Sequence, residues 1–127
     1  MLFLQFRLGQ DLCALAAEHI VEIVPLVDIE QPRQGAPGFD YRGRFIPVLD
    51  LALRETGQPA RRRMSTRIVV IRSPWSDTDD ALLGLIAEGA STMLRFEPAD
   101  FAPFAQGPDG PVQRVEPRDL VPQEARA

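Results

Sequence analysis

The amino-acid sequence predicts a mainly β protein, built as a barrel or a sandwich of short strands. Three observations lead to this prediction. Seven or eight short segments are apolar, either alternating with polar residues or rich in β-branched side chains. Turn-forming residues separate these segments, and no helix recurs between them in the rhythm of a parallel βαβ sheet. At 127 residues the chain fits one domain.

The first two strands are predicted from residues 3–15. Apolar side chains alternate with Gln5 and Arg7 between residues 3 and 8, a period of two that indicates a half-buried strand. A turn that begins at Gly9 leads into residues 12–15, the second strand of a hairpin. The only cysteine, Cys13, lies there, so we expect a buried, unreactive thiol and neither a disulfide within the chain nor a multi-cysteine metal site.

Residues 16–23 change to a helical spacing. Ile20 and Ile23 would share one face of a helix, and Glu18 and Glu22, four residues apart, would share another. We therefore expect one short helix here. Two like charges one turn apart repel each other slightly, so the glutamate pair is either a solvated face or a surface for a basic partner.

The middle of the chain contains a loop and two further strands. Prolines and glycines between residues 25 and 38 predict the loop. Residues 45–51 are apolar around Pro47, which lacks an amide hydrogen and therefore indicates an edge or a bulge. Residues 58–63 are expected to form an exposed connection. The β-branched run enclosed by Arg67 and Arg72 predicts a strand.

The second half of the chain is also mainly β. A turn is expected at residues 76–80, which are rich in aspartate. Residues 82–87 fit a helix or a strand by their period, but Gly84 and Gly89 favour a strand, with residues 92–96 as a neighbouring strand. We further expect a short strand at residues 112–115 and a helical turn at residues 117–120.

Charge is distributed unevenly along the chain. All 14 basic residues are arginine, and the net charge is −4. Nine arginines and three acids fall between residues 33 and 72, whereas four arginines and ten acids follow them. This division of charge along the chain has two interpretations. The protein has a basic and an acidic surface for two different partners, or the charges cluster by chance on solvated loops.

The sequence offers no pattern typical of an enzyme or a cofactor site. His19 is the only histidine and has no nucleophile near it in the sequence, so we expect a surface or structural role. No lysine is present to complete a phosphate-binding loop. The aspartates of residues 77–80 lack the glycine and the distant glutamate of a calcium loop. Nothing suggests that Asp50 and Glu55 share a pocket as an acid and base pair. We expect no catalysis, no metal and no cofactor.

Nucleic-acid binding and membrane insertion are also disfavoured. The arginines of residues 61–63, with Arg54 and Arg67, would form a phosphate-binding patch. The isoelectric point near 4.9 and the absence of aromatic residues between these arginines argue against nucleic acid. No apolar run approaches the ~20 residues of a membrane span, so we expect a cytoplasmic protein.

Two segments resemble the CheW family of chemotaxis coupling proteins. Residues 15–24 are similar to a family element in which a strand passes into a short helix ending Val-x-Glu-Ile. Residues 41–51 contain Arg-Gly followed by Pro-Val-Leu-Asp-Leu, which resembles the most recognisable run of the family. The order and spacing of the two segments also fit, and the likeness covers most of residues 2–121. Within the family, the sequences of these motifs are most similar to those of the accessory CheW-like proteins of Wsp-type surface-sensing pathways.

The resemblance implies a fold and a function. The fold would be two linked SH3-like five-stranded barrels with one short helix and a groove between the barrels. The function would be that of a non-catalytic adaptor in a chemotaxis or surface-sensing pathway, associated with receptor arrays at the inner membrane. One face would contact the tip of a methyl-accepting chemoreceptor and another the regulatory domain of a CheA-type histidine kinase. Self-association is a further expectation, because that domain is itself CheW-like. The alternative is a generic SH3-like module outside chemosensing that binds protein or nucleic acid.

The same resemblance selects the candidate site residues. Arg42 corresponds to a family arginine that matters for coupling receptor to kinase; its alternative role is an internal ion pair with Asp50 or Glu22. Gly43 would permit a tight turn beside it. Pro47 is expected mainly to shape a strand edge. The residues expected to bind partners are Arg42, Gly43, Glu22, Glu18, Arg44, Pro47 and Asp50.

The sequence departs from the family pattern at two places. Only residues 38–41 stand where relatives have a further apolar strand, and residues 101–112 stand where relatives have a longer loop. We therefore expect either a shortened barrel or segments absent from this sequence. The predicted organisation is a single domain of two barrel lobes over residues 1–121, followed by a flexible tail over residues 122–127.

Overall fold

The computed structural model describes residues 1–32, 35–77 and 80–123. Within these residues the chain forms nine strands, two short α-helices and two 3-10 turns. In chain order they are β1 (Leu2–Leu8), β2 (Asp11–Ala16), η1 (Ala17–His19), β3 (Ile20–Pro25), β4 (Gly38–Tyr41), β5 (Arg44–Asp50), α1 (Leu51–Thr56), β6 (Arg67–Arg72), β7 (Leu82–Arg95), η2 (Pro98–Phe101), β8 (Ala105–Gly107), β9 (Gly110–Val115) and α2 (Pro117–Leu120). None of the helices in these residues is long and apolar enough to cross a membrane.

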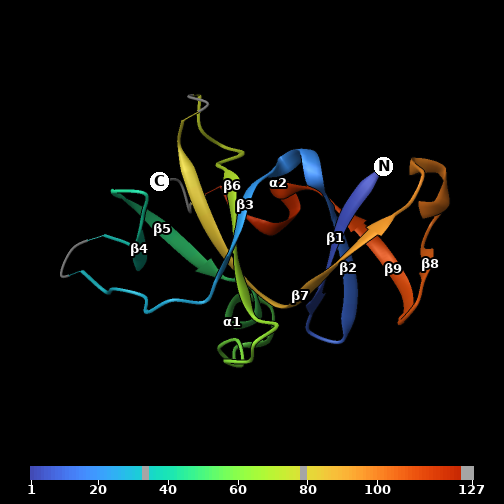
Figure 1. Ribbon diagram of the computed structural model, residues 1–127, viewed down its shortest axis with the longest axis horizontal. Coiled ribbons are helices and arrows are strands. Elements are labelled where there is room, and N and C mark those ends of the chain that lie inside the picture. The colour runs from blue at the N-terminus through green and yellow to red at the C-terminus, as the bar shows by residue number, and fades with distance from the viewer. Residues whose placement is uncertain (33–34, 78–79, 124–127) are drawn as a thin grey trace.

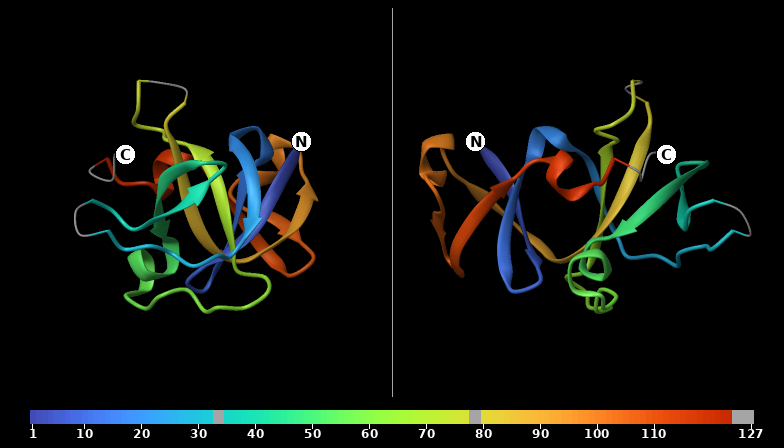
Figure 2. Two further views of the ribbon diagram at one scale, coloured as in Figure 1. Left: turned by 60° about the vertical axis from the view of Figure 1, so that its left-hand side comes forward. Right: turned by 180° about the vertical axis from the view of Figure 1, so that it is seen from behind.

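The strands form two lobes that share β7 (Figure 1). In the first lobe, the beginning of β7 pairs with β6 and β5, and β3 and β4 complete the set of five strands. In the second lobe, the end of β7 pairs with β1, and β2, β9 and β8 follow in order. The views of Figure 2 show the two lobes from other sides, with β7 passing between them. The predicted mainly β class and its division into two five-stranded units are confirmed.

The long strand β7 bends where it passes from one lobe to the other. Gly89 has a φ of 63°, a left-handed conformation that glycine adopts without steric cost. The pairing of β1 with β7 shifts register at the same level, between Gln5 and Arg7. The prediction of two neighbouring strands at 82–87 and 92–96 is therefore wrong: they are two halves of one strand, and each half has partners in a different lobe.

The central strands are buried on both faces. In β6, Ile68 and Val70 point into the core of the first lobe, whereas Val69 and Ile71 point into a core between the lobes. This two-sided burial explains why the sequence of β6 is a continuous run of β-branched residues rather than an alternation of apolar and polar residues. A third core, around Phe3, fills the second lobe. Cys13 is fully buried in the core between the lobes, as predicted.

The predicted helix over residues 16–23 is wrong. Only the 3-10 turn η1 is present, and β3 begins at Ile20 and pairs with β6. The segment from Ile20 to Val24 is mostly β-branched, and such residues favour a strand when a partner strand is available. Glu18 and Glu22 therefore do not share a helical face.

A short strand is present at each of the two places where we expect this chain to be shorter than its relatives. Residues 38–41 form β4, which pairs with β5 in a hairpin, so the first lobe does not lack the strand. Residues 105–107 form β8, which lies within the second of these segments, residues 101–112. The helix α1 was not predicted at all.

Two predictions fall at the edges of the described residues. In the turn expected at residues 76–80, residues 78–79 lie outside the described part of the chain. In the expected tail, residues 124–127 do as well. Val121, just before that tail, is fully buried.

Candidate partner-binding site

The hairpin of β4 and β5 carries Arg42 at its tip. Tyr41 and Arg44 close the hairpin as a strand pair, and the two residues between them have positive φ angles, 52° at Arg42 and 79° at Gly43. Two-residue hairpin loops favour this conformation because it matches the twist of the strands. Gly43 thus has the turn role predicted for it. The Arg42 side chain projects from the tip and is 74% exposed.

Arg42, Tyr41 and Glu22 form one bonded cluster, called here the Glu22 cluster. A single carboxylate oxygen, Glu22 Oε1, accepts hydrogen bonds from the Tyr41 hydroxyl at 2.6 Å and from Arg42 Nη2 at 2.7 Å. The Arg42 guanidinium carbon also lies 5.5 Å from the centre of the Tyr41 ring. Of the two ion pairs considered for Arg42, the structure forms the one with Glu22. The cluster ties β3 to the hairpin and orients the exposed guanidinium.

Hydrogen bonding changes the acid–base properties of this cluster. The Tyr41 hydroxyl, and next the Arg42 guanidinium, stabilise the Glu22 carboxylate and lower its pKa below its usual value. The Glu22 carboxylate in turn raises the pKa of Tyr41. Near neutral pH the cluster therefore combines an anionic Glu22, a neutral Tyr41 and a cationic Arg42.

Glu18 lies apart from the Glu22 cluster. It belongs to η1, and its carboxylate is 3.9 Å from His19 Nε2. The same imidazole nitrogen is 3.1 Å from Glu116, which follows β9. His19 therefore contacts acidic side chains at the protein surface. Among the described residues, no group of three or more His, Cys, Asp or Glu side chains could hold a metal ion.

Asp50 makes two hydrogen bonds within the protein. Its Oδ1 accepts from the Leu53 amide at 3.1 Å, which caps α1, and its Oδ2 accepts from the Ala60 amide at 3.0 Å. Asp50 therefore fixes both the helix and the connection that follows it. A direct bond from Asp50 to a partner would have to compete with these two amides.

Arg44 and Pro47 shape the hairpin and the strand beneath it. The Arg44 guanidinium donates to the backbone carbonyl of Asp80, which joins the hairpin to the β6–β7 loop. Pro47 is the last residue of β5 to pair with β4, and Val48 is the first to pair with β7. Pro47 thus lies where β5 changes partner, which is consistent with its missing amide hydrogen.

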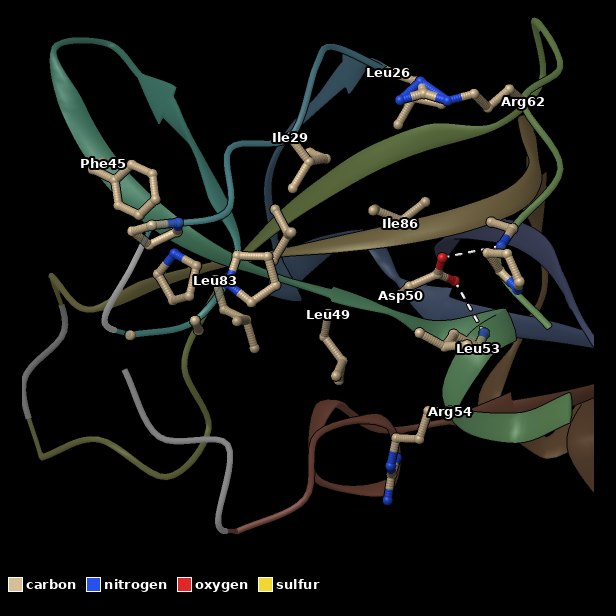
Figure 3. A pocket seen from close by; sticks show the side chains of 18 residues that line it. Leu26, Ile29, Phe45, Leu49, Asp50, Leu53, Arg54, Arg62, Leu83 and Ile86 are labelled. Carbon is tan, nitrogen blue, oxygen red and sulfur yellow. Dashed lines mark hydrogen bonds between the residues drawn. The ribbon is translucent and has the colours of Figure 1, made fainter. Parts of the chain in front are cut away.

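A large apolar groove opens beside the same hairpin (Figure 3). Its volume is about 1050 Å³. Two large apolar side chains in its lining, Phe45 and Leu53, are exposed, at 48% and 49%. Pro47 and Asp50 also line it. The remaining lining residues are Leu26, Ile29, Pro32, Gly35, Ala36, Pro37, Val48, Leu49, Arg54, Pro59, Ala60, Arg62, Leu83 and Ile86.

The groove was not predicted, and its lining explains why. Leu26 and Ile29 come from the long segment between β3 and β4, whose described residues form no helix or strand that would give apolar residues a period. Leu53 comes from α1, which the sequence analysis missed; Asp50 as N-cap and Gly57 in a left-handed C-cap were its signals. The groove is suited to the apolar ridge of a protein partner.

Comparison with known proteins identifies the family. The chain has the fold of the scaffolding protein TtCheW from Thermoanaerobacter tengcongensis, with a TM-score of 0.78 and 17% sequence identity. The similarity covers 98% of this chain and 90% of that chain. No curated protein matches the sequence. The family model of the CheW-like domain matches residues 2–116. The chain therefore belongs to the CheW-like domain family.

Proposed function

We propose that the chain is a non-catalytic adaptor that couples methyl-accepting chemoreceptors to a CheA-type histidine kinase. Membership of the CheW-like domain family supports this role. The observation that carries the proposal is the geometry of Arg42, which is held in place by Glu22 yet remains mostly exposed. A fixed, exposed guanidinium can form paired hydrogen bonds to a carboxylate or to backbone carbonyls of a partner.

The kinase regulatory domain is the partner we assign to the hairpin surface. The β4–β5 hairpin contributes Arg42 at its tip and Phe45 to the neighbouring groove, so one partner can contact both. An apolar centre with a charged rim is the usual composition of a protein interface. We expect roughly 800 Å² to be buried on each side, typical of a specific complex.

The receptor, on this proposal, contacts a second face of the molecule. Glu18 is the candidate residue for that face, because it lies on η1 rather than with the hairpin. The sequences of the two family motifs further favour an accessory protein of a Wsp-type surface-sensing pathway. Self-association would use the same surfaces, because the kinase domain is CheW-like.

Calorimetric titration with the regulatory domain of the CheA-type kinase from the same organism tests the proposal. We expect saturable one-to-one binding that is lost in the Arg42→Glu variant. The substitution replaces the guanidinium donor by a carboxylate, which also repels Glu22. The matched control is Arg95→Glu, which makes the same charge change at an exposed position on β7. That variant should bind like the parent protein.

A folding control separates a binding role from a structural role. Exposed ion pairs contribute little to stability, so Arg42→Glu should retain the parent circular dichroism spectrum and a cooperative thermal transition. An unfolded Arg42→Glu variant would make the residue structural. A folded variant that still binds the kinase domain with the parent affinity would refute the assigned contact. No binding by the parent protein would refute the kinase as partner.

A further inference from the structure

A polar cleft lies between the two lobes, away from the hairpin, and adjoins the apolar groove at Pro59, which lines both. Its volume is about 520 Å³, within the range of pockets that hold a small ligand or a short stretch of peptide. The β1–β2 turn belongs to its second-lobe side, whereas the end of α1 and the connection to β6 belong to its first-lobe side. The lining residues are Arg7, Gly9, Gln10, Ala52, Thr56, Gln58, Pro59, Arg61, Arg63, Ser65, Thr66, Glu88 and Gly89.

Three arginines reach this cleft from both lobes. Arg7 comes from β1, and Arg61 and Arg63 come from the connection between α1 and β6. All three are exposed, and within the described ranges their guanidinium groups form no hydrogen bond or ion pair. The Arg7 stem lies over the bend of β7, where a Cβ added at Gly89 would be 3.6 Å from Arg7 Cγ. The cleft thus presents uncompensated donors.

The backbone that carries Arg61 and Arg63 is held in place rather than left as a free loop. The Arg61 amide donates to Glu88 Oε1 at 2.6 Å, and the Arg61 carbonyl accepts a hydrogen bond from the buried Thr66 hydroxyl. The Thr66 amide donates to the Arg63 carbonyl at 3.0 Å. The one carboxylate in the lining, Glu88, is therefore already engaged by a backbone amide. Because the arginines stand on a fixed backbone, less conformational entropy is lost when a ligand binds them.

We propose that this cleft docks an acidic segment of a protein partner, with Arg7, Arg61 and Arg63 pairing with its carboxylates. Guanidinium groups suit carboxylates because they can donate two parallel hydrogen bonds. The amide side chains of Gln10 and Gln58 can bond to the backbone of such a segment. Next to the cleft, Met64 is 96% exposed, which leaves an apolar contact available for the same partner.

The lining favours a peptide over a nucleic acid. No aromatic side chain lines the cleft, so bases would have nothing on which to stack. Glu88 and a net charge of −4 disfavour a long polyanion, whereas a short acidic segment meets only the local arginines. The assignment is independent of the proposed function, because Arg42 does not line the cleft and the cleft shares only Pro59 with the apolar groove.

Binding of a fluorescein-labelled hexaglutamate peptide to the full chain, followed by fluorescence polarisation at physiological salt, tests the proposal. We expect saturable binding that the double variant Arg61→Gln/Arg63→Gln weakens by roughly tenfold or more. Arg7→Gln, which changes the opposite lobe, should weaken it as well. The control Arg95→Gln removes one exposed arginine outside the cleft and should leave the affinity unchanged. Arg42→Glu should also leave it unchanged, which separates this test from that of the proposed function.

Several outcomes would overturn the assignment. One is the absence of saturable binding by the parent protein. Another is an equal loss of affinity in Arg95→Gln, which would indicate attraction to net charge rather than to the cleft. Tighter binding of labelled oligothymidylate than of hexaglutamate would assign the cleft to nucleic acid instead. Backbone amide NMR shifts with hexaglutamate should map to the residues that line the cleft, and shifts confined to other surfaces would contradict the proposal.

Discussion

Glu22 unites the candidate site at the scale of single residues, because its carboxylate is the common acceptor for Tyr41 and Arg42. The Tyr41 hydrogen bond is the larger cause of its lowered pKa, and the Arg42 hydrogen bond is the second. We therefore predict that Tyr41→Phe and Arg42→Gln each raise the pKa of Glu22, because Tyr41 acts through its hydrogen bond and Arg42 through its hydrogen bond and its charge. NMR titration of the Glu22 side-chain carboxyl measures both shifts. An unchanged Glu22 pKa in either variant would contradict the bond assigned to that residue.

The lowered pKa of Glu22 also predicts a pH dependence of stability. A group whose pKa is lower in the folded state contributes stability that is present above its unfolded pKa and is lost as the pH falls through the folded pKa. The usual pKa of Glu is 4.5, so the contribution of Glu22 should be present at neutral pH and disappear in acid. Thermal melts of the parent protein and Glu22→Gln should differ at pH 7 and converge as the pH falls below 4.5. A difference that persists in strong acid would place the effect of Gln in packing rather than in charge.

Among the elements, the segment from β5 to β6 depends on Asp50. Its two oxygens cap α1 and hold the Ala60 amide. Replacing a helix N-cap by Ala costs about 0.5–2 kcal/mol, and the loss of the second acceptor should place Asp50→Ala toward the upper end. Urea unfolding measures the change. Asp50→Asn keeps the capping oxygen but replaces one acceptor by a donor, so it should destabilise less. Equal losses in both variants would show that the bond to Ala60 carries the whole effect.

The elements also show how far the sequence determines the structure. The position of β6 and the bounds of the terminal turn α2 were predicted correctly, because β-branched residues in one and Pro117 in the other are local signals. Residues 16–23 were misread because their strand depends on pairing with β6, which is distant in the chain. The sequence likewise named Glu22 as one of two partners for Arg42. It gave no sign of Tyr41 as the shared donor, since that contact requires the register of the hairpin.

At the scale of the whole molecule, the two lobes are joined by more than β7. A core between them contains Leu4 and Phe6 of the second lobe together with Val69 and Leu85 of the first. The C-terminal segment completes this core, with Leu120 and Val121 buried in it. Backbone carbonyls of this segment accept hydrogen bonds from the first lobe: Leu120 from Arg54 Nη1 at 2.7 Å and Val121 from Trp75 Nε1 at 2.6 Å. Because this core is built from both lobes, neither lobe can unfold without exposing the other's apolar surface.

This shared core predicts that Leu120→Ala weakens both lobes together. Truncating a buried leucine costs about 2–5 kcal/mol, and the cost should appear in a single cooperative transition. Urea unfolding can be followed in the first lobe by Trp75 fluorescence and in the second by the NMR signals of Phe3, which is buried in the core of that lobe. The two probes should give the same midpoint in the parent protein and the same lowered midpoint in the variant. Separate midpoints in the parent protein would show that the lobes fold independently, and the C-terminal segment would then be a local contact rather than the link that couples them.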